Sequence, residues 1–207
     1  SPLVIRSPFG GGIHAPEHHS DSPEAIFIHT PGIKVVIPSS PYDAKGLIKA
    51  AIRDEDPVLF FEPKRIYRAI KEEVPDEEYT VPIGKAKVVR EGKDLTLISW
   101  GAMVRETLRA AEAAEREGVS SEVVDLRTLS PMDEEAFLTS VRKTGRAVVV
   151  QEAPRTCGLG AEISARIQET SLLYLEAPVE RITGFDTVVP LLKLEKHYLP
   201  TPERILR

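Results

Sequence analysis

The feature that most constrains the fold of this chain is an alternation between short runs rich in β-branched residues and longer stretches with helical spacing. The runs have the length of strands; they lie at 3–6, 33–38, 58–62, 86–90, 95–100, 121–126, 146–152 and 179–183. Helical patterns separate most of them, the clearest at 103–118, where Gly118 closes an amphipathic stretch. Strands alternating with helices in this way predict an α/β fold with a mostly parallel sheet.

Two helices carry a recognisable start signal. Ser40 is placed as the N-cap, Pro41 as the first helical residue and Asp43 at the capping-box position. The same spacing recurs in 130–133, so we expect a second helix to begin there and run to about residue 143.

A charged stretch divides the chain. Residues 63–82 contain three prolines and show no strand period, which is typical of a linker over the surface. We therefore expect one α/β unit over 1–66, a linker over 67–82 and a second α/β unit over 83–207. The chain also opens inside an apolar run with no initiator methionine, so we expect that sequence in front of Ser1 is missing.

The bulk composition excludes several classes of function. A net charge of −5 over 207 residues argues against nucleic acid as the main partner, because phosphate binding needs a basic surface. No apolar run approaches the roughly 20 residues of a membrane-spanning helix. The single cysteine cannot form a disulfide within the chain, which fits a reducing compartment.

The chemistry is concentrated in the segment HAPEHHSDSPE, residues 14–24. His14, His18 and His19, with Glu17 and Glu24 nearby, suggest zinc, but Pro16 and the preceding glycines oppose the regular helix that such a site needs. Ser20, His19 and Asp21 are sequence neighbours, whereas the members of a catalytic triad meet through the fold. A solvated polar loop is the simplest alternative. Against it, Gly10–Gly12 would let the backbone approach another group closely, and Ser22 with Pro23 would start a helix behind the loop.

A second candidate region is CGLGAE, residues 157–162, at a strand-to-helix junction. Its backbone N–H groups could receive an anion, but the match to a dinucleotide-binding fingerprint is poor. We interpret the glycines as a tight turn for close helix packing, and Cys157 as a half-buried structural residue.

Taken together, several motifs in the same order resemble the β subunit of the thiamine-diphosphate-dependent 2-oxo acid dehydrogenases. The segments are 10–68 and, further on, TLISWGAMV, VVDLRTLSPMDEEA, KTGRAVVVQEAP and ITGFDT. Within that family the branched-chain type looks most similar, and the pyruvate type shares much of the pattern. The resemblance implies that 1–66 is the second half of a pyrimidine-binding domain and that 83–207 is a transketolase-like C-terminal domain.

The resemblance also implies an activity and its partners. Such enzymes are α2β2 heterotetramers that decarboxylate a 2-oxo acid oxidatively and pass the acyl group to a lipoyl arm on an acyltransferase. The α subunit holds magnesium and the diphosphate of the cofactor, and the β residues that bind the cofactor lie in a front segment that nothing here matches. The isolated chain is therefore expected to be inactive. The location would be a prokaryotic cytoplasm or a mitochondrial matrix.

One residue of this chain matches the family's catalytic histidine. It is the histidine immediately before the serine of HSDSPE, His19, with Asp21 where glutamine is common. An imidazole there could donate to the substrate carboxylate or move protons. Some members also bind a structural potassium ion through backbone carbonyls, and the matching residues here are Ser1, Leu3, Val4, Ala51, Asp54 and Asp56.

Two other readings stay open. The chain could be an assembly module of such a complex without a chemical role. It could also belong to another transketolase-like thiamine enzyme, although HHSDSPEA and FFEPK favour the dehydrogenases. The choice between pyruvate and a branched 2-oxo acid is left open, because the residues that would line the substrate pocket are mainly absent from this chain.

Overall fold

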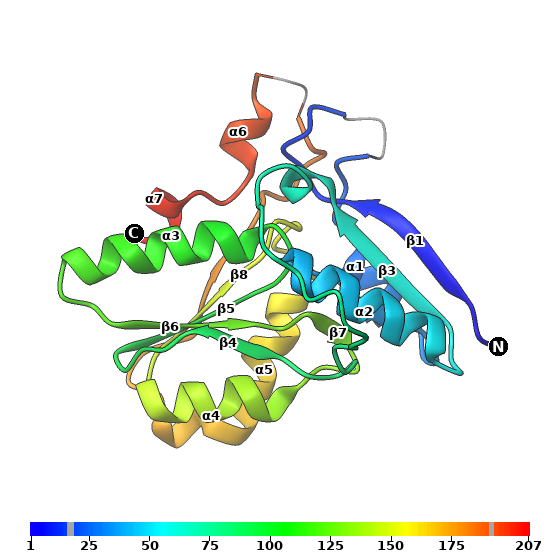
Figure 1. Ribbon diagram of the computed structural model, residues 1–207. Helices are drawn as coiled ribbons and strands as arrows, with labels where there is room; N and C mark the ends of the chain where they lie inside the picture. The colour runs from blue at the N-terminus through cyan, green and yellow to red at the C-terminus, as the bar shows by residue number, and fades with distance from the viewer. Residues whose placement is uncertain (16–18, 191–192) are drawn as a thin grey trace.

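The computed structural model describes residues 1–15, 19–190 and 193–207, which form two sheets flanked by helices (Figure 1). The first sheet contains, in spatial order, β1 (Val4–Phe9), β3 (Val58–Pro63), β2 (Lys34–Val36) and β7 (Thr128–Ser130). The second contains β4 (Lys87–Arg90), β6 (Ser121–Asp125), β5 (Leu95–Ser99), β8 (Ala147–Val150) and β9 (Glu180–Ile182). β7 and β4 run antiparallel to their neighbours and the other pairs are parallel. The predicted α/β class with a mostly parallel sheet is confirmed.

The helices cover both sheets. In the second sheet, α3 (Met103–Arg116) lies on one face, and α4 (Glu134–Thr144) and α5 (Leu159–Ser171) lie on the other (Figure 1). The first sheet packs with α1 (Glu24–Ile28) and α2 (Pro41–Arg53). The described residues also contain the short helical segments η1 (Lys64–Ile66), η2 (Leu172–Tyr174), α6 (Glu195–Tyr198) and α7 (Pro202–Ile205). In the described part of the chain, no helix has the length and apolar character needed to cross a bilayer.

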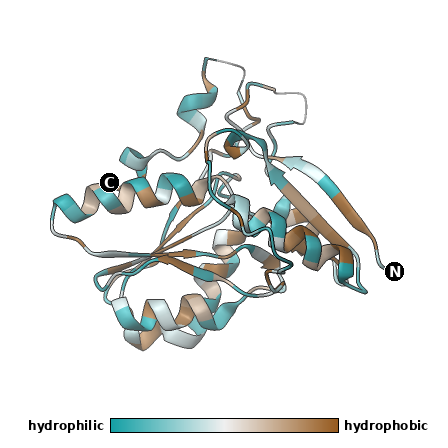
Figure 2. Ribbon diagram, in the orientation of Figure 1, coloured by the Kyte–Doolittle hydropathy of each residue, from teal (hydrophilic) through white to brown (hydrophobic). Residues whose placement is uncertain are grey.

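The central strand β3 is hydrophobic and mostly buried, as expected for a parallel strand covered on both sides. Successive side chains of β3 point to opposite faces. Val58 and Phe60 therefore pack with α2, whereas Leu59 and Phe61 face a larger core that both sheets share. Figure 2 shows this concentration of hydrophobic residues along the strands, with hydrophilic residues on the outer faces of the helices.

The first predicted helix start is confirmed and the second is wrong. The Ser40 side chain accepts the backbone N–H of Asp43 at the start of α2. Ser130 does not cap a helix, because it is the last residue of β7, paired with Val35 of β2. Helix α4 begins four residues later, at Glu134. The local pattern fails here because Ser130 is held in a strand by its pairing with Val35, a residue distant in the sequence. Similarly, α1 begins at Glu24 with Pro23 before it and no side-chain cap.

The predicted linker contains no helix or strand over 67–82, and it packs closely along α2. The Tyr79 ring stacks on Tyr42 of α2, with 4.5 Å between centroids. Val81 is buried, and the Glu78 carboxylate lies 2.9 Å from Lys49 Nζ. The division into 1–66, 67–82 and 83–207 stays a prediction. Residues of its last part nevertheless complete the first sheet, since β7 pairs with β2.

A buried polar group, here called the arginine cluster, joins the two parts next to β7. It consists of Arg127, Asp43, Ser39 and Asp125. Arg127 Nη1 lies 2.9 Å from Asp43 Oδ1, and its guanidinium also donates to the carbonyls of Lys85 and Ala86. The Ser39 hydroxyl donates to Asp125. Burial raises the pKa of Asp125 to about 7.

Candidate functional site at the histidine loop

The candidate site is the loop that follows β1, here called the histidine loop, residues 10–22. It leaves the first sheet at the carboxyl end of β1 and lies beside α6 (Figure 1). Glu152, two residues beyond the end of β8, lies beneath it. Carboxyl ends of parallel strands are the usual place for ligand sites in α/β proteins. The fold therefore places the predicted histidine segment where an active site is expected.

The glycine run brings the backbone against a buried carboxylate. Gly10 has a φ of 80°, and a Cβ built on it would lie 2.5 Å from Glu152 Oε1. The next residue, Gly11, donates its backbone N–H to Glu152 Oε2 at 2.9 Å. The prediction that these glycines allow a close backbone approach is confirmed, and the group approached is Glu152.

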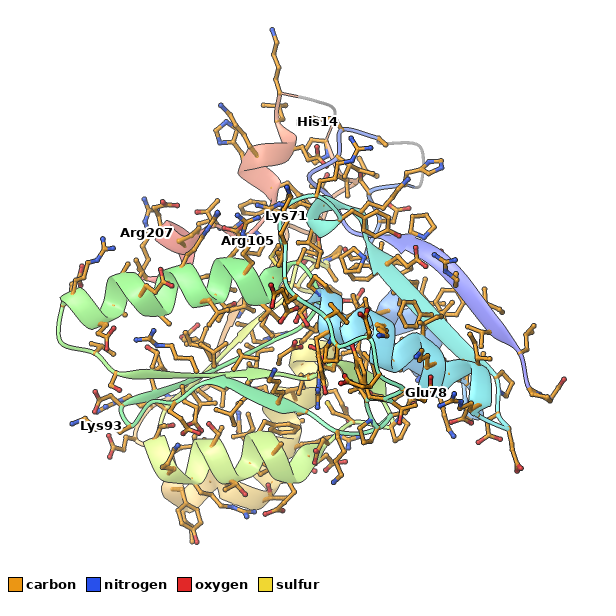
Figure 3. The ribbon with its side chains drawn as sticks, viewed as in Figure 1. His14, Lys71, Glu78, Lys93, Arg105 and Arg207 are labelled. Atoms are coloured by element: carbon orange, nitrogen blue, oxygen red, sulfur yellow. The ribbon has the colours of Figure 1, made fainter. Side chains whose placement is uncertain are left out.

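A second carboxylate, Glu195 of α6, binds the following residues of the loop. Glu195 Oε1 accepts the Gly12 N–H at 2.5 Å, and Oε2 accepts the His14 N–H at 3.1 Å. The His14 Nδ1 atom also lies 2.7 Å from Glu195 Oε2. Glu195 is 1% exposed, so its carboxylate is compensated by the loop rather than by water. His14 is labelled beside the α6 segment in Figure 3.

A third buried carboxyl group, Glu24 at the start of α1, lies close enough to Glu152 for the two charges to interact. Burial raises the pKa of Glu24 to about 8 and that of Glu152 to about 7. Trp100 Nε1–H donates to Glu24 Oε1 at 3.3 Å. Within the described ranges, Glu24 Oε2 and Glu152 Oε1 have no hydrogen-bond partner. Near neutral pH both carboxyl groups therefore carry protons for much of the time.

His19, in the second half of the histidine loop, is exposed. Its neighbour Ser20 is buried, and the Ser20 hydroxyl donates to the Ala15 carbonyl at 2.9 Å. Through this hydrogen bond Ser20 connects the two sides of the loop. The backbone of Gly10 donates to the Asp21 carbonyl at 2.9 Å, which closes the loop at its base.

The zinc alternative rests partly on Glu17 and His18, which lie outside the described residues. In the described ranges no three or more His, Cys, Asp or Glu side chains are grouped as metal ligands. The His14 imidazole is directed to Glu195.

The CGLGAE segment packs tightly, as interpreted from the sequence. A Cβ on Gly158 would lie 2.1 Å from Gln151 Nε2, and Gly160 donates its N–H to Gln151 Oε1 at 2.7 Å. The expectation that Cys157 is half-buried is wrong. Cys157 is exposed. It lies in the turn before α5 and has a φ of 55°.

Of the six residues predicted to bind potassium, Leu3 and Val4 lie beside the start of β3, and Asp54 and Asp56 precede β3 in the chain. Val4 is the β-ladder partner of Val58, and the Leu3 carbonyl accepts the Val58 N–H at 2.8 Å. The Ala51 carbonyl accepts the Asp54 N–H at 3.3 Å, and Ser1 is exposed. The ammonium group of Lys34 lies 2.7 Å from Asp54 and 3.0 Å from Asp56. A side-chain cation therefore already neutralises these two aspartates, and potassium binding stays a prediction.

Sequence reasoning did not identify Glu152, Glu195 or Trp100 as part of this region. Glu152 had a usable signal, since an acidic residue just after a buried parallel strand is placed at the ligand-binding edge of the sheet. Glu195 had none, because it contacts residues about 180 positions earlier. Trp100 lies in the segment TLISWGAMV, but nothing in that segment predicts its contact with Glu24.

Comparison with known families supports both parts of the fold. Residues 1–70 match the transketolase pyrimidine binding domain, and residues 84–205 match the transketolase C-terminal domain. A solved structure titled "Split gene transketolase, inactive beta4 tetramer" superposes with a TM-score of 0.79 at 27% identity, covering 98% of this chain and 63% of that one.

Curated relatives are similar over the whole chain. The pyruvate dehydrogenase E1 component subunit beta of Bacillus subtilis is 55% identical over 206 residues, which are 100% of this chain and 63% of the relative. The protein of the same name from Acholeplasma laidlawii is 55% identical over 204 residues, 99% of this chain and 62% of the relative. That from Staphylococcus aureus strain N315 is 52% identical over 206 residues, 100% and 63%. The chain thus spans just under two thirds of the length of these relatives.

Proposed function

The chain belongs to the transketolase C-terminal domain family, and from this premise we propose that it is part of the β subunit of a 2-oxo acid dehydrogenase. The reaction would be oxidative decarboxylation of a 2-oxo acid, with transfer of the acyl group to a lipoyl arm on a partner acyltransferase. The observation that carries the proposal is the 55% identity to a pyruvate dehydrogenase β subunit over the full chain. The names of the relatives favour pyruvate over a branched 2-oxo acid. Their bacterial origin favours a prokaryotic cytoplasm.

Thiamine diphosphate with magnesium is the cofactor that this function requires, and the described residues do not form its cradle. They contain no group of three or more metal-ligating side chains. The unpartnered oxygens of Glu24 and Glu152 are single buried carboxyl atoms and do not by themselves make a cradle for a diphosphate. The cofactor, which supplies a nucleophilic carbon, would be held by an α subunit and by β residues outside this chain. A second β subunit would complete the enzyme. A structural potassium ion at the start of β1 and β3 is also part of the proposal.

The chemical role of this chain would rest on His19. Its imidazole is exposed on a loop whose base is closed and whose first half is bound to buried carboxylates. An imidazole in that position can donate to the carboxylate of a 2-oxo acid and can move a proton near neutral pH.

The test is His19→Asn in the complete enzyme, assembled with its α subunit. We expect kcat to fall by about 10²-fold or more, the usual range for a positioned proton-transfer group. The size of the assembly, measured by sedimentation, should not change. His29→Asn is the matched control, because His29 is an exposed histidine just after α1. Unchanged turnover in His19→Asn would leave only the assembly-module role.

A transketolase-like activity is the second candidate, favoured by the superposition on the split-gene transketolase structure. It predicts transfer of a ketol unit between sugar phosphates, with no acylation of lipoyl groups. Assaying both reactions in one preparation separates the two candidates. The isolated 207-residue chain should catalyse neither.

A further inference from the structure

We propose that Glu195 is the positioning residue of the histidine loop, that Glu152 is its second anchor, and that His14 belongs to this anchor rather than to the chemistry. The inference rests on the proposed function for its effect on turnover. It concerns residues of the second part of the chain that hold a loop of the first part.

The first step is that one carboxylate binds two backbone N–H groups and one imidazole nitrogen from a short piece of the chain. Gly12 N–H binds one oxygen of Glu195, and the N–H and Nδ1 of His14 bind the other. Because Glu195 is buried, loss of these donors would leave buried acceptor oxygens without partners. The Glu195 side chain therefore stabilises this loop conformation in particular.

The second step connects the anchor to His19. Glu195 fixes His14, and the carbonyl of the next residue, Ala15, accepts the hydroxyl of Ser20. Ser20 directly follows His19 in the chain. At the loop base, Gly10 donates to the Asp21 carbonyl, and Glu152 fixes Gly11. The backbone on both sides of the loop is thus bound, so a shift of α6 would shift His19.

The third step explains why the anchor must be a glutamate. A glutamine at 195 has one acceptor oxygen, and its NH2 group would face an N–H donor from Gly12 or from His14. An aspartate is shorter by one methylene group. The side chain of His14 can be removed separately, because His14 has a φ of 59°, a conformation that asparagine tolerates.

The experiment measures Glu195→Gln in the complete enzyme by two readouts. Amide hydrogen exchange followed by mass spectrometry should become at least tenfold faster in the peptide covering 10–15. Turnover should fall at least tenfold in kcat, with no loss of assembly and a melting temperature close to that of the parent. Glu169→Gln, at an exposed glutamate of α5, is the control and should change neither readout.

Unchanged exchange and unchanged kcat in Glu195→Gln would overturn the proposal. If that variant does not fold, His14→Asn gives the answer. It should raise exchange in the same peptide and lower kcat by about threefold or more, and no change in either would overturn the anchor. The proposed function is judged separately by His19→Asn. If that variant keeps full turnover, the dehydrogenase assignment of His19 fails, while the exchange data still decide whether Glu195 holds the loop.

Discussion

Two buried polar groups join the first sheet to the second part of the chain, and they compensate their carboxylates differently. In the arginine cluster, Asp43 is paired with the guanidinium of Arg127. In the group formed by Glu24, Glu152 and Glu195, here called the glutamate cluster, the donors are backbone N–H groups, Trp100 and His14. A buried cation compensates a carboxylate across the whole physiological pH range. At Glu24 and Glu152 the donors are the Trp100 indole and the Gly11 backbone N–H, and burial raises the pKa of both carboxyl groups.

Asp125 shows that a carboxylate must contact the guanidinium of Arg127 directly to be compensated by it, and that lying near it is not enough. It lies in the arginine cluster, yet its side chain is bonded to the Ser39 hydroxyl rather than to the guanidinium. Burial raises its pKa to about 7, as in the glutamate cluster. We therefore expect the contact between Arg127 and Asp43 to stabilise the fold, and Asp125, Glu24 and Glu152 to respond to pH.

Breaking the arginine cluster should have the largest effect. Arg127→Met leaves the Asp43 charge buried without its partner, so we expect the free energy of unfolding to fall by about 3–5 kcal/mol. Urea denaturation at pH 7 measures it. Arg146→Met is the control, since Arg146 pairs with Glu176 at 2.7 Å with both side chains about half exposed, and surface pairs contribute at most about 1 kcal/mol. Equal losses in the two variants would contradict the structural role of Arg127.

Glu24 of the glutamate cluster should make the stability of the fold depend on pH. The folded-state pKa of Glu24 is about 8, above the 4.5 of an unperturbed glutamate. A raised pKa stabilises the fold below about pH 4.5, and that contribution is lost as the pH rises toward 8. Glu24→Gln keeps the acceptor for Trp100 but removes the titration.

The variant should therefore gain stability relative to the parent as the pH rises, by about 2–4 kcal/mol at pH 8–9. Thermal and urea unfolding between pH 5 and 9 measure the difference, with Glu169→Gln as the exposed control. If the difference in unfolding free energy between Glu24→Gln and the parent does not depend on pH, burial does not raise the pKa of Glu24.

The smallest effect is expected for a substitution at Ser40, the residue that caps α2 and contacts Asp43 of the arginine cluster. Ser40 accepts the Asp43 N–H at 3.1 Å, and its hydroxyl lies 2.9 Å from Asp43 Oδ2, so it supports the arginine cluster while capping the helix. Ser40→Ala should cost about 1 kcal/mol of unfolding free energy. Combined with Arg127→Met, the two losses should differ from additivity by about 0.5 kcal/mol or more. Simple addition would mean that Ser40 acts on the helix alone.

The sequence allowed the strands, the long helices and the start of α2 to be predicted, because each depends on a local period or a short capping pattern. It also pointed to the histidine loop through its composition and glycine run. It did not reveal β7, whose three residues have no strand period and pair with β2 through contacts about 90 positions apart. Glu195 could not be predicted as part of the site for the same reason, because its contacts are also distant in the sequence. A surface-like glutamate in a short helix becomes an anchor only when the fold brings residues 12 and 14 to it.

The pairing of β7 with β2 has a consequence for how the molecule comes apart. A protease that cuts within residues 67–82 severs the covalent connection but leaves the ladder between Val35 and Ser130 and the contact between Asp43 and Arg127. The two pieces should then migrate together on a native gel and separate only in detergent. The two fragments would stay associated through noncovalent contacts after the connecting segment is cut, and would not separate as two independent domains.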